Sequence, residues 1–192
     1  MHRDPVIQLL TAYRETNPAE AQVADRILAL VNSRPDCFDR TCRPGHLTGS
    51  AWVVSPDGER HLLLHHRKLD KWLQPGGHAD GQTDLAEVAL REAIEETGLQ
   101  SLKVVANHRG VAVLDLDVHD IPARYAPDGS LVEDGHEHHD VRFLLQANAD
   151  ESLCVSDESH DLRWCTPDEV AALTQEWSVL RLLEKARRRL DR

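Results

Sequence analysis

The sequence predicts a mixed fold of helices and strands, of the α+β or α/β sandwich class, and three observations lead to it. From residue 47 onward, short apolar strands alternate with turns. A glycine-rich loop at 76–81 precedes one long helix, and another helix ends the sequence. Strands on both sides of a long helix are typical of a sheet with helices packed on it. Residues 1–45 hold helical patterns only, so we expect an N-terminal helical extension and then one domain over residues 46–192.

The extension is expected to contain two amphipathic helices. One helical face of the first carries apolar residues, namely Val6, Leu9, Leu10 and Tyr13. The second is predicted to start at Asn17-Pro18-Ala19-Glu20, because Asn caps helices, Pro suits the first helical position and Glu20 lies three residues after the cap. Arg34-Pro35 is expected to end it. Apolar helical stripes usually face a core. We therefore expect these helices to pack on the rest of the chain or to form a homodimer contact.

The first strands and the long helix follow in order. Residues 47–55 and 60–66 are predicted to form two strands of a hairpin, because turn-forming residues separate two apolar runs. After the glycine-rich loop, a helix is expected from about Asp84 to Thr97. Gly98 is expected to stop it, because glycine readily adopts the left-handed conformation after a helix.

The second half of the chain continues the alternation of strands and helices. Strands are predicted at about 102–119 and 139–147, with a loop rich in Pro, Gly, Asp and His between them. A short strand near 161–165 leads to Thr166-Pro167-Asp168-Glu169, which has the pattern of a helix start. The last helix is expected at about 177–190.

Charge and hydropathy exclude some classes of function. The formal net charge of −11 argues against binding of a nucleic acid polymer, which needs Lys and Arg to neutralise phosphates. A small phosphorylated substrate is compatible with that charge, because a bound metal ion can reverse the local field. No apolar run approaches the roughly 20 residues of a membrane span, and no apolar signal core follows Met1. We expect a cytoplasmic protein with no membrane partner.

Three glutamates of the long helix form the first candidate site. Glu92, Glu95 and Glu96 stand at positions i, i+3 and i+4, so they project from one helix face. Carboxylates this close repel one another unless cations compensate them, and oxygen ligands suit Mg²⁺ or Mn²⁺. The alternative is a solvated acidic face on which Arg91 and Glu95 form an ion pair.

The segment 77–99 resembles the Nudix box, G-x5-E-x7-R-E-U-x-E-E-x-G-U, where U is an apolar residue. The matching positions are Gly77, Arg91, Glu92, Glu95, Glu96, Gly98 and Leu99. One position departs from the pattern, because Thr83 stands where the box has its first Glu. The neighbouring Asp84 would supply a carboxylate if the loop is one residue longer. The resemblance extends over roughly residues 46–175.

The resemblance implies the Nudix α/β/α sandwich with a mixed sheet, formed by residues 46–192. It implies a metal-dependent hydrolase that cleaves a diphosphate linkage in a nucleoside diphosphate derivative or a similar small phosphorylated compound. The metal would be Mg²⁺ or Mn²⁺, and its implied ligands are Gly77 through its carbonyl, Glu92, Glu95 and Glu96. Arg91 would orient a carboxylate of that set, and the general base would be Glu92 or Glu158. A non-catalytic ligand-binding domain is a further alternative.

A second candidate site consists of histidines outside the box. His136 and His138 are two residues apart, so they share a face if the strand predicted at 139–147 begins early. Imidazole suits transition metals better than it suits Mg²⁺. The alternative is that these are solvated histidines of a loop.

A weaker resemblance joins these histidines to two more. The segments His46-Leu47-Thr48-Gly49-Ser50-Ala51-Trp52 and Gly77-His78 are similar to two segments of isopentenyl diphosphate isomerase, where a histidine at each place binds a metal. The resemblance implies a second, transition-metal site beside the box carboxylates, formed by His46, His78, His136 and His138. An isomerase-like activity is the alternative function, but Gly76 stands where the isomerase has its catalytic Cys.

Overall fold

The computed structural model describes residues 2–148 and 151–191. Two helices come first, α1 (Asp4–Thr16) and α2 (Ala21–Ser33), which pack against each other and are joined by the 3-10 turn η1 (Pro18–Glu20). The expected Asn17 cap does not form, because the Asn17 amide donates back to the Tyr13 carbonyl (2.9 Å). The Glu20 carboxylate binds the Tyr13 hydroxyl and the Lys185 ammonium instead of reaching back to Asn17. The hydrogen bond between the Glu20 carboxylate and a charged, partly buried ammonium group is stronger than one to a neutral backbone amide.

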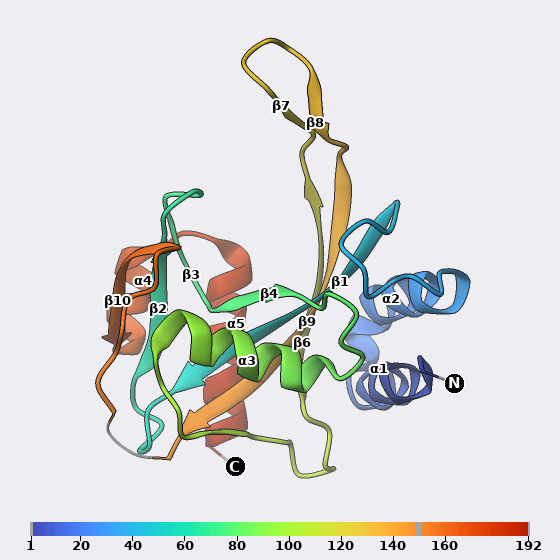
Figure 1. The fold of residues 1–192 in the computed structure, drawn as a ribbon. Helices are drawn as coiled ribbons and strands as arrows, with labels where there is room; N and C mark the ends of the chain where they lie inside the picture. Colours follow the sequence, from blue (N-terminus) through green and yellow to red (C-terminus); the bar gives the residue numbers. More distant parts are fainter. Residues whose placement is uncertain (1, 149–150, 192) are drawn as a thin grey trace.

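The centre of the molecule is a mixed sheet of eight strands (Figure 1). The strands are β1 (Gly45–Val54), β2 (His61–His66), β3 (Lys71–Leu73), β4 (Gly76–His78), β5 (Leu102–Val104), β6 (Val113–Ile121), β9 (His136–Ala147) and β10 (Ser159–Cys165). The main order is β10-β2-β1-β9-β5, with β3 beside β2, β4 beside β1 and β6 beside β9. Strands β1 and β9 are parallel, and the other pairs are antiparallel.

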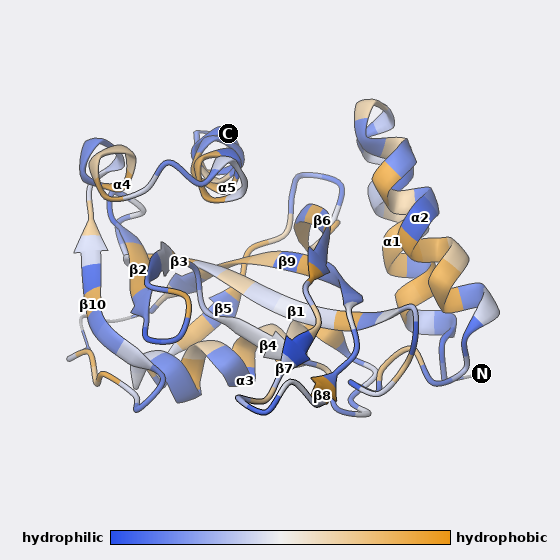
Figure 2. Ribbon diagram, turned by 90° about the horizontal axis from the view of Figure 1, so that it is seen from above, coloured by the Kyte–Doolittle hydropathy of each residue, from blue (hydrophilic) through white to orange (hydrophobic). Residues whose placement is uncertain are grey.

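Helices cover both faces of this sheet (Figures 1 and 2). Helix α3 (Leu85–Thr97) lies on one face, and α4 (Pro167–Leu173) and α5 (Trp177–Leu190) lie on the other. The alternation along β1 explains both cores, because Leu47, Ala51 and Val53 belong to the apolar cluster of α3. Trp52 and Val54 belong to the cluster of α5. The arrangement confirms the expected α/β/α sandwich with a mixed sheet.

The N-terminal helices share the core of the sheet. Leu10, Tyr13 and Ile27 are fully buried, in the same apolar cluster as the α3 face of β1. Both helices also contact β6. The apolar stripes of these helices therefore pack on the rest of the chain, which was the first of the two expectations.

The second half of the sheet differs from the prediction in its details. The single strand predicted at 102–119 is divided into β5 and β6, because residues 105–112 turn around Asn107, whose side chain accepts from two backbone amides. Strands β3 and β4 were not predicted. The loop between β6 and β9 contains the hairpin β7 (Arg124–Tyr125) and β8 (Leu131–Glu133), which projects from the body (Figure 1). No helix among the described residues is long and apolar enough to cross a membrane.

Candidate active site and histidine cluster

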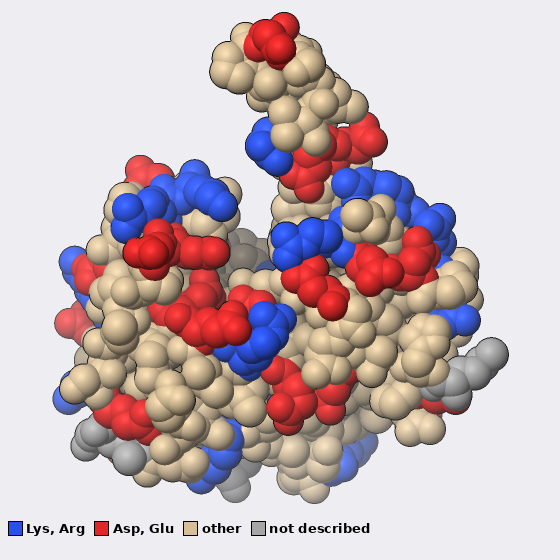
Figure 3. Space-filling model, viewed as in Figure 1, with Lys and Arg blue, Asp and Glu red and all other residues tan. Residues whose placement is uncertain are grey.

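Helix α3 presents the three glutamates as their spacing predicts. Its start is set by Asp84, whose Oδ1 accepts from the amides of Ala86 (3.0 Å) and Glu87 (3.3 Å), and Gly98 ends it with a left-handed φ of 79°. Asp84 therefore serves as the N-cap of α3, next to Thr83, which has no carboxylate at the first acidic position of the box. Figure 3 shows acidic side chains gathered over α3, below a hollow beside the projecting hairpin.

The three glutamates differ strongly in burial. Glu96 is 7% exposed, Glu92 is half-buried and Glu95 is exposed. Strand β4 causes this difference, because it runs across α3 and the Gly76 amide donates to Glu96 Oε2 (2.9 Å). A Cβ added at Gly77 would lie less than 3.0 Å from the Glu92 carboxylate, so only glycine lets the strand approach this side chain.

Arg91 links the glutamates to the same strand. Its guanidinium contacts Glu92 Oε1 (2.8 Å) and Glu95 Oε2 (3.5 Å), and it donates to the carbonyl of His78 (3.0 Å). The side chain therefore holds two carboxylates and the end of β4 at once, which is the geometry that its expected orienting role needs.

The electrostatics of the glutamates favour a bound cation. Burial raises the pKa of Glu96 to about 8, and the charges of Glu92, Glu158 and Glu95 add to the rise. Burial is also the main cause that raises the pKa of Glu92, and Glu95 and Glu158 contribute. Glu158 is exposed in the turn before β10, near enough for its charge to act on both groups. A divalent cation would relieve this repulsion, so the residues fit a hard metal ion.

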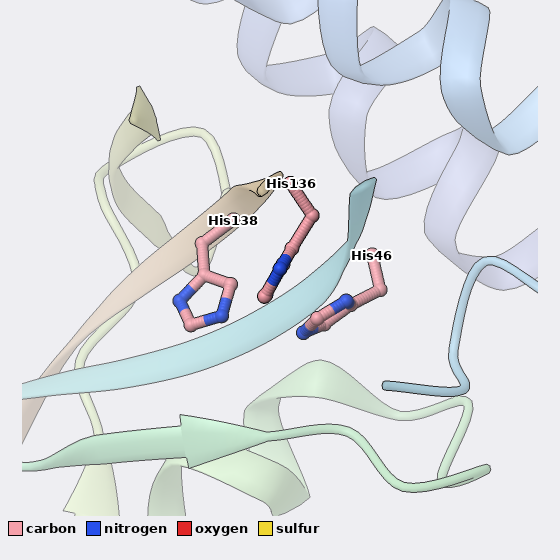
Figure 4. Close-up of side chains that lie close together, drawn as sticks. All are labelled: His46, His136 and His138. Carbon is pink, nitrogen blue, oxygen red and sulfur yellow. The ribbon is translucent and has the colours of Figure 1, made fainter. Parts of the chain in front are cut away.

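The sheet also gathers the predicted histidines. Strand β9 does begin early, at His136, and its parallel pairing with β1 sets His138 opposite His46. The candidate ligand atoms of His46, His136 and His138 all lie within 4.8 Å of one another (Figure 4). The His78 ring centroid is 5.1 Å from those of His46 and His138. The four histidines predicted as a site therefore converge.

Burial favours the neutral imidazole form of His46, His78 and His138. Burial, and then the neighbouring histidines, lower the pKa of His46 to about 3, and the pKa of His138 falls for the same reasons. Burial also lowers the pKa of His78. Neutral imidazole is the form that can bind a metal.

The glutamates of α3 and the histidine cluster both contact β4, but on opposite faces of this strand. Gly77 faces Glu92, and the next residue, His78, points to the opposite face because side chains alternate along a strand. The sequence predicted the histidines beside the box carboxylates and did not assign the two groups to faces of the sheet. The histidine cluster lies across the strand from the carboxylates.

Sequence reasoning missed a polar network next to the cluster, on the same face. Asp140 accepts hydrogen bonds from Thr48 (2.9 Å), Ser50 (2.8 Å) and Arg142 (2.7 Å). Arg142 continues the network to Asp115 (3.2 Å), so the polar layer crosses β1, β9 and β6. The strict alternation of polar residues in Thr48-Gly49-Ser50 and Asp140-Val141-Arg142 was a signal that could have revealed it.

Comparison with known proteins identifies the family. The sequence profile of the NUDIX domain matches residues 46–185, which is most of the chain. The chain belongs to the NUDIX domain family. The match starts at the first histidine of the cluster and includes the three glutamates of α3, so both candidate sites lie within the NUDIX domain. No curated protein matches this sequence.

Several solved structures of hydrolases share this fold. A NUDIX-family hydrolase from Clostridium perfringens is 21% identical, with a TM-score of 0.55 over 76% of this chain and 96% of its own. A C. elegans Ap4A hydrolase complex is 18% identical, with a TM-score of 0.54 over 76% and 97%. The E. coli dihydroneopterin triphosphate pyrophosphohydrolase is 21% identical, with a TM-score of 0.53 over 74% and 94%. At these identities the likeness shows a common fold.

Proposed function

We propose that this chain is a metal-dependent pyrophosphohydrolase that cleaves a diphosphate linkage in a nucleoside diphosphate derivative or a similar small phosphorylated compound. The observation that carries the proposal is the set of Glu92, Glu95 and Glu96 on one face of α3, with the glycines of β4 against two of them. The names of two structural neighbours, an Ap4A hydrolase and a triphosphate pyrophosphohydrolase, agree with it.

The chain's own residues would hold and shape the site. Glu92, Glu95, Glu96 and the Gly77 carbonyl would bind Mg²⁺ or Mn²⁺, which when bound neutralises charge on the phosphates and activates water for attack. Arg91 keeps Glu92 and Glu95 in place, and the Gly76 amide keeps Glu96 turned toward β4. Glu92 and Glu158 remain the two candidates for the base that accepts a proton from the attacking water.

One observation weighs against an isomerase-like activity. The related isomerase carries its catalytic Cys at the position of Gly76. A Cβ at this position would lie 2.9 Å from Ser50 Cα, which belongs to the backbone of β1. The strand pairing therefore leaves no room for such a side chain, and no other cysteine replaces it within β4.

The test is a screen of diphosphate compounds with Mg²⁺ or Mn²⁺, followed by variants of α3. We expect Glu95→Gln and Glu96→Gln to lower kcat by at least about 100-fold and to leave the fold intact, because each removes a charge that binds the metal. Glu87→Gln, at an exposed position of the same helix, is the matched control. Wild-type turnover in either active-site variant, on a confirmed substrate, would exclude this metal site.

The same assay decides between the two candidate bases. If Glu158 accepts the proton, Glu158→Gln lowers kcat by about 100- to 10,000-fold. The binding of Mn²⁺, measured by electron paramagnetic resonance, should then weaken much less than in Glu95→Gln, since Glu158 is not an expected ligand. A Glu158→Gln enzyme with normal turnover would assign the role to Glu92.

A further inference from the structure

The histidine cluster is built by strand register. His46 of β1 lies opposite His138 of β9, and residues opposite each other in a sheet share a face. His136 is two residues before His138 and so shares that face. His78 of β4 lies opposite Thr48, which is two residues after His46. Three neighbouring strands therefore direct four imidazoles to one place.

Three buried ring nitrogens of this cluster have no hydrogen-bond partner among the residues that the structure describes. They are both ring nitrogens of His46, which is only 1% exposed, and Nε2 of His138. Buried polar atoms are nearly always hydrogen-bonded in native proteins, so three such nitrogens at one place point to a site that binds a ligand. Packing of the rings against one another does not satisfy their nitrogens.

A fixed tautomer supports the same conclusion. His136 Nδ1 lies 2.9 Å from the backbone carbonyl of Asp134, so this nitrogen carries the proton and donates it. The lone pair is then on Nε2. Metal-binding histidines typically donate their other ring N–H to a carbonyl or carboxylate in this way.

The spacing suits an ion at the centre. Four nitrogens around a tetrahedral Zn²⁺, at 2.0–2.1 Å each, are separated from one another by about 3.3 Å. The candidate atoms of His46, His136 and His138 already lie within 4.8 Å of one another. The remaining difference is about 1.5 Å, which is within the reach of imidazole side chains that turn about their χ angles.

We propose that His46, His78, His136 and His138 together bind one divalent transition metal ion, with Zn²⁺ the best fit to four imidazole ligands. Mg²⁺ is disfavoured, because it prefers oxygen ligands. The ion ties β1, β4 and β9 together on the face of the sheet opposite α3.

The position of His78 couples this ion to the carboxylate site. Its side chain would bind the ion, while its carbonyl accepts from Arg91 (3.0 Å) and the preceding Gly77 faces Glu92. The ion therefore positions the strand that carries the glycines of the proposed active site. This coupling rests on the proposed function, whereas the binding of the ion does not.

The first test measures the metal itself. Protein purified without a His-tag, and supplied with Zn²⁺ before gel filtration, should retain about one transition metal per chain by elemental analysis. His46→Gln and His78→Gln should lose it. His108→Gln, in an exposed loop, and the Glu95→Gln/Glu96→Gln double variant should keep it. Loss of the metal from the glutamate double variant, or retention of the metal in both histidine variants, overturns the proposal.

A second measurement starts from the wild-type protein, so its first result does not depend on whether a variant folds. Adding Zn²⁺ to metal-free wild-type protein at about 100-fold excess over its Kd should raise Tm by about 5–10 °C. In His78→Gln, whose histidine is only half-buried, the rise should disappear. An unchanged wild-type Tm would contradict binding.

The coupling has a separate readout. If the ion positions β4, Mn²⁺ binding at the glutamates should weaken by about 10- to 100-fold when the ion is absent. Electron paramagnetic resonance of Mn²⁺ with wild-type and His78→Gln protein measures this. Equal Mn²⁺ affinities would leave an ion without influence on the active site and would refute the coupling, even if hydrolysis is confirmed.

Discussion

Gly77 affects two groups that the proposed reaction needs. Its own carbonyl is an expected metal ligand, and its Cα faces the Glu92 carboxylate. A methyl group at this position would meet the end of the flexible Glu92 side chain. We expect Gly77→Ala to change Tm little, because Glu92 can swing away, but to lower kcat/KM by about 100-fold, because the carboxylate is displaced by roughly an ångström.

A suitable control for this variant is Gly135→Ala. There the nearest atom to an added Cβ is 3.4 Å away, and φ is not in the left-handed region. Thermal unfolding and steady-state kinetics on both variants make the comparison. Activity lost together with a large drop in Tm would show instead that Gly77 serves the fold.

The burial of His61 leads to a prediction about the pH dependence of stability. It is 1% exposed and accepts a hydrogen bond from Trp52 Nε1 (3.0 Å), and burial lowers its pKa to about 4. Below pH 6.5 the unfolded chain binds a proton that the folded chain does not. The stability from His61 is therefore complete above pH 6.5 and is lost as the pH falls toward 4.

We expect this difference to be about 2 kcal/mol between pH 7.5 and pH 5. His61→Gln keeps an acceptor for Trp52 but does not titrate, so it isolates the contribution of His61 from those of the other histidines. Urea unfolding of both proteins at the two pH values gives the comparison. Parallel losses of stability in wild type and variant would contradict the assignment.

Residue spacing predicted which side chains meet, but not how buried each one is. The i, i+3, i+4 positions placed Glu92, Glu95 and Glu96 on one face, as found. Their spacing could not show that Glu96 is buried and Glu95 exposed, because that difference is made by a strand from another part of the chain. The same holds for the histidines, whose convergence depends on the register of β1 against β9.

Among the elements, the long periodic ones were predictable and the short ones were not. Helices α3 and α5 and strand β1 have clear apolar patterns, and the structure confirms them. Helix α3 also has capping residues at both ends, Asp84 and Gly98. Strand β4 is only Gly76–His78, too short for any periodic signal, yet it carries residues of both candidate sites. Its existence follows from pairing with β1, which is a tertiary interaction.

A buried charge network joins several elements. Asp115 of β6 is fully buried and accepts from Arg142 of β9 (3.2 Å), and from Arg181 (2.8 Å) and Lys185 (2.6 Å) of α5. Lys185 also reaches the Tyr13 hydroxyl of α1 (2.9 Å). Removing the charge of Asp115 leaves three cations short of a partner inside the protein.

We expect Asp115→Asn to lower the free energy of unfolding by about 3 kcal/mol, since loss of one partner from a buried ion pair is strongly destabilising. The exposed pair of Glu184 and Arg188 is the control. Glu184→Gln should change stability by no more than about 0.5 kcal/mol. Similar urea midpoints for both variants would show that the network contributes little.

On the scale of the whole molecule, the N-terminal helices raise the question of whether residues 1–45 are a separate appendage. The NUDIX match begins at residue 46. The apolar cluster extends across that boundary, because Leu10 and Ile27 pack in the same core as Leu47 and Val88. Family boundaries follow similarity of sequence, whereas cooperativity follows shared buried surface, so we expect one folding unit.

Leu10→Ala tests this expectation. Leu10 is fully buried, so its truncation should cost about 2–5 kcal/mol and lower Tm by about 5–15 °C. All four tryptophans lie beyond residue 45, so their fluorescence reports only on the NUDIX domain. If the chain unfolds as one unit, the fluorescence midpoint shifts together with the circular dichroism midpoint. Gln8→Ala, at an exposed position of α1, should leave both in place. A fluorescence midpoint unmoved by Leu10→Ala would mean that the helices melt independently, since an appendage cannot transmit its loss of packing to the sheet.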